Sequence, residues 1–185
     1  MKRIFLWFYC LPISGVIMLI AMTTGAFWYL RYKFSNTLRW KVGIPILFIC
    51  SIGVILLGTL GQRVTDGNAA APILIPFHSY YLALTSGNVE LYRTNFMNAI
   101  LFYPAGLLGC ALLPQRWRKI HKVLLLTIPF ALLSIWIEYT QYRLGLGLTE
   151  TDDVIHNTLG ILLGALACHA FRPKNHPTAA TLQIN

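Results

Sequence analysis

The segment "TETDDVIHNTLGILLG", residues 149–164, joins a group of acids to a run of small and apolar residues. Residues three or four positions apart on a helix share a face. One stripe of this segment therefore combines a carboxylate, an amide and two glycines: Asp153, Asn157, Gly160 and Gly164. The glycines form a GxxxG pattern, which lets a second helix approach closely. We expect the polar pair to face protein and not lipid.

The whole chain is apolar enough for a membrane protein. Of its 185 residues 56% are hydrophobic and only 11% are charged, and its mean hydropathy is +0.60. A helix needs ~20 mainly apolar residues to cross a bilayer. Uncharged runs occupy residues 4–30, 42–62, 94–115, 123–137 and 154–171. The sequence predicts an all-α, polytopic integral membrane protein with about five transmembrane helices.

Two of these runs differ from a simple transmembrane span. The run 123–137 is short, so we expect its helix to continue through Glu138 toward Tyr142, which puts Glu138 inside the span. The run 4–30 follows Lys2 and Arg3, and a cleaved signal peptide is the alternative to a first span. Its length of 27 uncharged residues favours the span.

The distribution of cations predicts the topology. With five spans, one side holds five cations and the other holds ten: Lys2, Arg3, Arg63, Arg93 and Arg143 against Arg31, Lys33, Arg39, Lys41, Arg116, Arg118, Lys119, Lys122, Arg172 and Lys174. The positive-inside rule then puts the N-terminus outside and the C-terminus in the cytoplasm. The net charge of +9 therefore indicates topology and contact with membrane lipids, and no nucleic-acid partner.

The loop of residues 61–93 is the longest, and its apolar part is too short and too proline-broken to span. We expect an interfacial outer loop that could cover the later helices. The four cysteines lack CxxC spacing, so neither a metal site nor a cofactor is expected. No nucleophile elbow, Walker loop or HExxH motif occurs, so the catalytic residues are unknown and a role other than enzyme is favoured.

Helical spacing predicts a polar cluster in the outer leaflet. Ser134, Glu138 and Gln141 share one face of the fourth span, and Asn98 shares a face of the third span with Gly109. Counted from the outer interface, the polar residues of three spans lie about one turn deep. The predicted cluster consists of Asn98, Glu138, Gln141, Asp153 and Asn157.

Each part of this cluster also has a structural interpretation. Thr149 and Asp152 match a capping box, and acids are favoured at a helix start. Glu138 is different, because an intramembrane carboxylate is costly and indicates a functional site by default. A purely structural clamp of carboxylate and amide groups remains the alternative.

Four blocks of the sequence resemble successive blocks of the VanZ-like membrane proteins. They are "LIPF" at 74–77, "NAILFYPAGLLG" at 98–109, "SIWIEYTQ" at 134–141 and the opening segment at 149–164. The matched positions are Pro76, Phe77, Asn98, Phe102, Pro104, Gly106, Glu138, Gln141, Asp153, Asn157 and Gly160. The chain departs from the family pattern at Ile73, Gly147 and Glu150.

The resemblance implies a VanZ-like transmembrane domain at 73–171, after an N-terminal transmembrane hairpin at 1–72 and before a polar cytoplasmic tail at 172–185. It also implies residence in the bacterial plasma (inner) membrane. Pro104, Gly106, Gly160 and Gly164 are expected to pack helices together.

The founding member of that family is associated with resistance to the lipoglycopeptide teicoplanin. We therefore expect the five polar residues to bind an amphiphilic envelope ligand, a lipoglycopeptide antibiotic or a lipid-linked cell-wall component. The alternative is a non-catalytic accessory subunit of another membrane complex, with a protein partner and with the cluster as interhelical glue. An enzyme acting on a lipid head group has weaker support, and transport has the least.

Overall fold

A computed structural model describes residues 13–34, 37–61, 71–88 and 90–170 of the chain. The helices are α2 (Ile13–Phe34), α3 (Leu38–Thr59), α4 (His78–Ser86), α5 (Glu90–Leu112), α6 (Lys119–Leu144) and α7 (Thr151–Ala170). Within these ranges there is no strand, only an isolated parallel bridge between Ile73 and Glu150. The all-α prediction is confirmed. The predicted tail at 172–185 lies outside the described residues.

Local sequence sets where the long helices begin and end. The Thr37 hydroxyl caps α3 by accepting a hydrogen bond from the Trp40 amide at 3.3 Å. At the end of α6, Gly145 adopts a left-handed conformation with φ of 60°. The next amide, Leu146, donates to the Gln141 carbonyl at 2.9 Å and satisfies a group that the helix end leaves free.

Three of the described helices are long and apolar enough to cross a membrane: α3, α5 and α6. The prediction of five spans is therefore not confirmed. α7 falls short because its first two turns carry Asp152, Asp153, His156 and Asn157. The predicted first span at 4–30 lies partly outside the described residues. The extension of the fourth span is confirmed, since α6 continues through Glu138 to Leu144.

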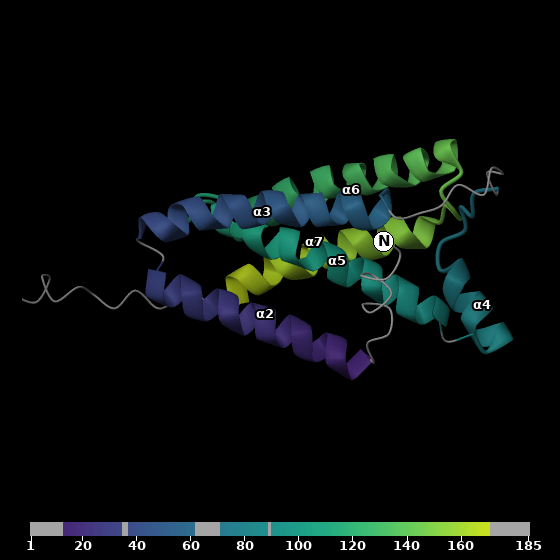
Figure 1. Cartoon of the computed structure of the whole chain (residues 1–185), viewed down its shortest axis with the longest axis horizontal. Coiled ribbons are helices and arrows are strands. Elements are labelled where there is room, and N and C mark those ends of the chain that lie inside the picture. Colours follow the sequence, from purple (N-terminus) through teal and green to yellow (C-terminus); the bar gives the residue numbers. More distant parts are fainter. Residues whose placement is uncertain (1–12, 35–36, 62–70, 89, 171–185) are drawn as a thin grey trace, which may run out of the picture.

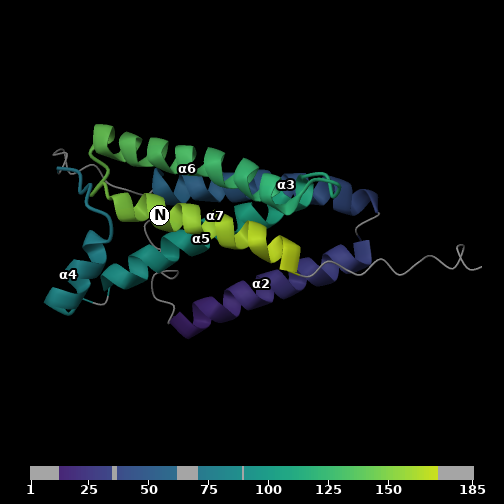
Figure 2. The ribbon, with the colours of Figure 1, turned by 180° about the vertical axis from the view of Figure 1, so that it is seen from behind.

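The helices form a bundle with two distinct ends (Figure 1). α5 and α7 lie at its centre, α3 and α6 lie along one side, and α2 lies at the edge, as the view from behind also shows (Figure 2). One end, which we call the α4 end, holds α4, the start of α5, the end of α6 and the start of α7. The opposite end, which we call the basic end, holds the α2–α3 and α5–α6 connections.

Glycines bring the backbones of α5 and α7 into direct contact. A Cβ on Gly160 would lie 2.1 Å from the Ala99 carbonyl oxygen, and one on Gly164 would lie 2.2 Å from that of Tyr103. On α5, a Cβ on Gly106 would lie 2.2 Å from the Ile161 carbonyl oxygen. The helix that approaches the glycines of the GxxxG pattern in the structure is α5. Pro104, expected in the same packing, is part-buried within α5.

The buried core lies between the central helices, and apolar side chains also cover the outside. The core includes Ile55, Phe102, Ile137 and Ile161, which are fully buried. Many large apolar residues of α3 and α6 are exposed, among them Ile49, Leu57, Leu132 and Trp136. A soluble monomer rarely exposes so much contiguous apolar surface. These faces fit lipid, in agreement with the membrane prediction.

Gly160→Ala should lower the free energy of unfolding by about 1 to 3 kcal/mol, because the new methyl group would force α5 and α7 apart. Gly53→Ala in α3 is the matched control, since a Cβ there meets nothing within 4 Å. The control should be neutral or stabilising by up to about 1 kcal/mol. Unfolding by SDS in mixed micelles, followed by circular dichroism, measures both. Equal stability of the two variants would contradict the close contact.

Candidate functional site

The five polar residues of the predicted cluster are all buried toward the α4 end of the bundle. Their exposed fractions are at most 8%, for Asn98, Glu138, Gln141, Asp153 and Asn157. Buried polar side chains are stable only when they form hydrogen bonds, so their partners define what the cluster does.

Two of the amides join neighbouring helices. The Asn98 amide of α5 donates to the Asp153 carboxylate of α7 at 2.6 Å. One turn deeper, the Asn157 amide of α7 donates to the Ser134 hydroxyl of α6 at 2.9 Å. α7 is thus bonded on both sides through the stripe that the sequence predicts.

Glu138 and Gln141 of α6 bond to different parts of the chain. The Glu138 carboxylate accepts a hydrogen bond from the Glu150 amide at 3.1 Å, in the segment that leads into α7. The Gln141 amide donates to the Thr59 carbonyl at 3.0 Å, at the end of α3. Sequence spacing predicts one converging group. In the structure, Asn98 bonds to Asp153, while Glu138 and Gln141 also fasten the segment before α7 and the end of α3.

Asp152 caps a helix that lies far away in the sequence. Its carboxylate accepts hydrogen bonds from the backbone amide of Phe77, from the Ser79 amide at 2.9 Å and from the Ser79 hydroxyl. Asn95 of α5 donates to that hydroxyl at 2.7 Å. The predicted capping box of Thr149 and Asp152 is therefore wrong. The Asp152 carboxylate satisfies the start of α4, where Phe77 offers no side-chain cap.

The segment before α4 is clamped to the segment before α7. The Ile73 amide donates to the Thr149 carbonyl at 2.9 Å, and the Thr151 amide donates to the Ile73 carbonyl at 3.0 Å. Phe77 follows with φ of 61°, a left-handed conformation that costs a residue with a Cβ roughly 1 to 2 kcal/mol. The bond to Asp152 holds this strained residue in place. Strain of this kind is concentrated at ligand clamps and switch regions.

A second contact fastens α4 to α7 through Tyr80 and His156. Nδ1 of His156 lies 2.6 Å from the Asp152 carbonyl oxygen, which can only accept a hydrogen bond. In the neutral ring Nδ1 therefore carries the proton, and Nε2 accepts from the Tyr80 hydroxyl at 2.6 Å. Burial raises the pKa of Tyr80 above its usual range, and the nearby Asp152 charge raises it further. The hydroxyl stays protonated and remains a donor at neutral pH.

Two acceptor atoms of the cluster have no donor. Among the described residues, nothing donates to Oε1 of Gln141 or to Oδ1 of Asn157, although both atoms are buried. An unpaired buried polar atom costs about 1 to 3 kcal/mol. A ligand group with N–H or O–H donors could recover that cost. No set of three His, Cys, Asp or Glu residues in the described ranges is placed to hold a metal ion.

The clamped segment displays apolar side chains on its outer surface. We call this set the α4 patch: Leu74, Ile75, Phe77, Tyr81 and Leu84, each at least 58% exposed. Beneath it, Ser79 and Ala83 of α4 are buried. The predicted interfacial loop therefore contains a short helix with one buried and one apolar exposed face. Such a face suits a membrane interface or an amphiphilic molecule.

Spacing could have identified only some of these residues. Asn95 lies three positions before Asn98 and so shares its face, a signal that was available in the sequence. Ser79 and Tyr80 meet residues 73 and 76 positions later, and no local pattern predicts such a pairing.

Comparison with known proteins identifies one family. A family model described as VanZ/LLP1 matches residues 44–172, which include α5, α6 and α7 and all five cluster residues. Neither a curated protein nor a solved structure matches the chain.

Asp152→Asn should loosen α4, because an amide cannot accept the three hydrogen bonds that the carboxylate accepts. We expect the free energy of unfolding to fall by about 1 to 3 kcal/mol and the amides of residues 77–82 to exchange hydrogen faster. The control is Glu90→Gln, which removes an exposed acid that forms an ion pair with Arg93 at 3.2 Å. This change should lower the free energy of unfolding by less than about 1 kcal/mol. Unchanged exchange in α4 would show that Asp152 is not its cap.

Proposed function

The chain belongs to the VanZ/LLP1 family, and from this premise we propose that it binds an amphiphilic ligand of the bacterial envelope at its α4 end. The ligand class is a polar head group that carries an alkyl chain. A lipoglycopeptide antibiotic such as teicoplanin and a lipid-linked cell-wall component both belong to this class. Binding would sequester or present the ligand, and no turnover is proposed.

The α4 patch is the observation that carries this proposal. Its side chains are exposed on a segment fixed by the Ile73 bridge and by Asp152, so their arrangement is set before any ligand arrives. Preorganised apolar groups bind an alkyl chain with a smaller entropic loss than a mobile loop would. Leu74 and Leu84, at 71% and 77% exposed, offer the largest contact.

The polar cluster beneath the patch supplies groups for the head group. Asn157 Oδ1 and Gln141 Oε1 are acceptors that need donors. One carboxylate shares a helix face with each of them, since Glu138 precedes Gln141 by three residues and Asp153 precedes Asn157 by four. Glycopeptides and cell-wall precursors are rich in N–H and O–H donors. We therefore propose Asn98, Glu138, Gln141, Asp153 and Asn157 as the polar half of the binding site.

The charge distribution supports an outward-facing α4 end. The described acids lie at this end, on α5, on α6, on α7 and in the segment that leads into α7: Glu90, Glu138, Glu150, Asp152 and Asp153. Most of the described cations lie at the basic end. By the positive-inside rule, we propose that the α4 end faces outward from the plasma membrane, where such a ligand is found.

A second candidate function is that of an accessory subunit in another membrane complex. It is favoured by the hydrogen bonds of the cluster, since each of the five side chains already fastens one element to another. In this case the cluster holds the bundle together, and the exposed apolar faces of α3 and α6 would contact a protein. Crosslinking that recovers a stoichiometric partner would favour this candidate over ligand binding.

Expression in a teicoplanin-sensitive bacterium should protect the host, and the protection should depend on both halves of the site. We expect Leu84→Ser, Glu138→Gln and Asn157→Ala to lose most of it at normal membrane abundance. The measurements are the minimal inhibitory concentration and the amount of protein in the membrane. Ile49→Ser, an exposed apolar residue of α3 away from the patch, is the matched control for Leu84→Ser.

The pattern of loss separates the two candidate functions. If Leu84→Ser abolishes protection, and the wild-type protein gives no protection against a glycopeptide that lacks an alkyl chain, the α4 patch binds the alkyl chain of the antibiotic. If abundance falls in step with protection in Glu138→Gln and Asn157→Ala, those residues hold the bundle and the binding proposal loses its polar half. Full protection by all three abundant variants would sink the proposal.

A further inference from the structure

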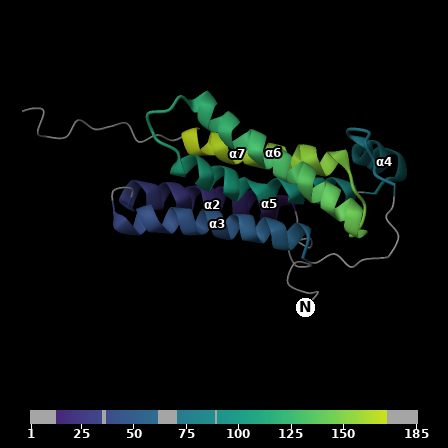
Figure 3. The ribbon, with the colours of Figure 1, turned by 90° about the horizontal axis from the view of Figure 1, so that it is seen from above.

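The basic end of the bundle contains a cleft between α2 and α3. The two helices diverge away from this end (Figure 1) and overlap in the view from above (Figure 3), and the space between them has a volume of about 330 Å³. Apolar and small residues form most of its lining: Leu30, Phe34, Trp40, Gly43, Ile44 and Leu47. Ligand cavities in proteins begin at roughly this size.

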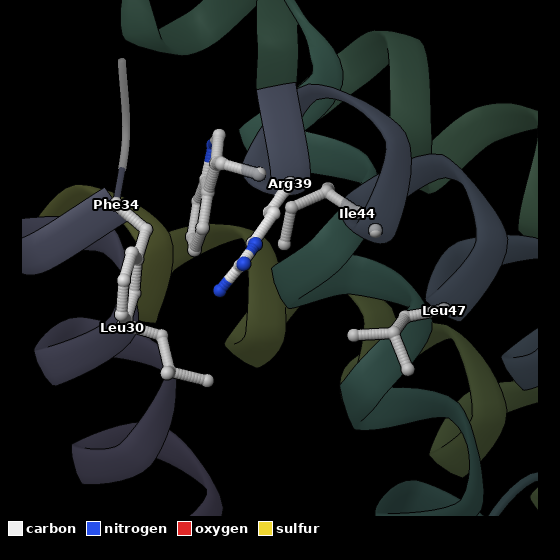
Figure 4. Close-up of a pocket in the computed structure, with 7 residues that line it drawn as sticks. Leu30, Phe34, Arg39, Ile44 and Leu47 are labelled. Carbon is white, nitrogen blue, oxygen red and sulfur yellow. The ribbon is translucent and has the colours of Figure 1, made fainter. Parts of the chain in front are cut away.

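One cation lies in this apolar lining. Arg39 projects its guanidinium into the space between Leu30 and Phe34 on α2 and Leu47 on α3 (Figure 4). No carboxylate can neutralise it from nearby in the sequence, because residues 1–65 contain neither Asp nor Glu. The acids that the structure describes lie at the α4 end. A guanidinium forms strong, often bidentate hydrogen bonds with phosphate and carboxylate groups, so Arg39 is suited to bind an anion.

Neighbouring cations of the same hairpin are already engaged. Arg31 lies over the Trp28 ring, 5.1 Å from its centroid, and donates to the Cys168 sulfur at 3.3 Å. Lys33 lies 5.5 Å from the centroid of the Phe34 ring. Within the described ranges, Arg39 has neither a hydrogen bond nor an aromatic partner of this kind. Lys41 is also exposed, but it does not line the cleft, so Arg39 is the cation of this hairpin that is positioned to bind an anion there.

The depth of the cleft matches an amphiphile that lies in the bilayer. Arg39 is in the first turn of α3, which is one of the three candidate membrane spans. Leu47 lies eight residues further along the helix, about 12 Å deeper at 1.5 Å per residue. The charge is thus at the interface and the apolar walls extend toward the membrane interior. A small soluble anion would bind at Arg39 without contacting these apolar walls.

We propose that this cleft binds one anionic phospholipid, with its phosphate on Arg39 and an acyl chain between α2 and α3. A guanidinium can hold two phosphate oxygens at once, which a lysine cannot do. The net charge of +9 and the lack of acids among the described residues of this end add attraction for an anionic membrane surface. This site is separate from the α4 end and does not depend on the function proposed for it.

Native mass spectrometry of the full-length protein can test the site with phosphatidylglycerol and phosphatidylcholine of identical acyl chains. Arg39→Gln should weaken phosphatidylglycerol binding about tenfold or more. Lys41→Gln is the matched control, because it removes the same charge two residues away and does not line the cleft. That control should change binding by less than about threefold. Phosphatidylcholine should bind more weakly than phosphatidylglycerol to the wild-type protein.

Gly43→Leu tests the acyl-chain half of the proposal. A Cβ on Gly43 meets nothing within 4 Å and Gly43 lines the cleft, so leucine should occupy part of the cleft and also favour the helix. This variant should fold normally by circular dichroism and yet bind phosphatidylglycerol as weakly as Arg39→Gln does. Equal losses in Lys41→Gln and Arg39→Gln would overturn the proposal in favour of diffuse surface charge. Wild-type affinity in Gly43→Leu would overturn it as well.

Discussion

The contact between the backbones of α5 and α7 is the constraint on which the α4 end depends. Gly106, Gly160 and Gly164 allow carbonyl oxygens to lie where a side chain would otherwise stand. Only at this separation can short side chains such as Asn98 and Asp153 reach across at 2.6 Å. Asp152 and His156 are on the same helix, so the position of α4 also follows from this approach. Packing at the glycines therefore sets polar geometry one to two turns away.

Periodicity within helices could be predicted from the sequence, whereas contacts between distant segments could not. The stripe of Asp153, Asn157, Gly160 and Gly164 needs only the helical repeat, and the continuation of α6 through Glu138 needs only the width of a bilayer. The role of Asp152 was missed because a local cap was available as an explanation. Its actual partners lie more than 70 residues earlier, and no spacing rule indicates them. The predicted number of spans is not confirmed, because polar turns shorten the apolar part of α7 and part of the predicted first span lies outside the described residues.

The two ends of the bundle have opposite chemistry. At the α4 end, buried carboxylate and amide side chains form hydrogen bonds with one another and with the backbone, and the outer surface is apolar. At the basic end, one cation, Arg39, lies in the otherwise apolar lining of a cleft, and none of the residues that line it is acidic. A single membrane-embedded bundle can in this way present two different surfaces to the two leaflets of the same bilayer.

The capping of α4 by Asp152 has a consequence for biosynthesis. Residue 77 leaves the ribosome long before residue 152, and domains form in the order in which they are made. During that interval the start of α4 has unsatisfied amides and Phe77 has nothing to hold its left-handed conformation. The hydrogen bonds of Asp152 to the start of α4 can therefore form only after α7 has been synthesised. The last helix that the structure describes thus completes a surface whose other residues are encoded near the middle of the chain.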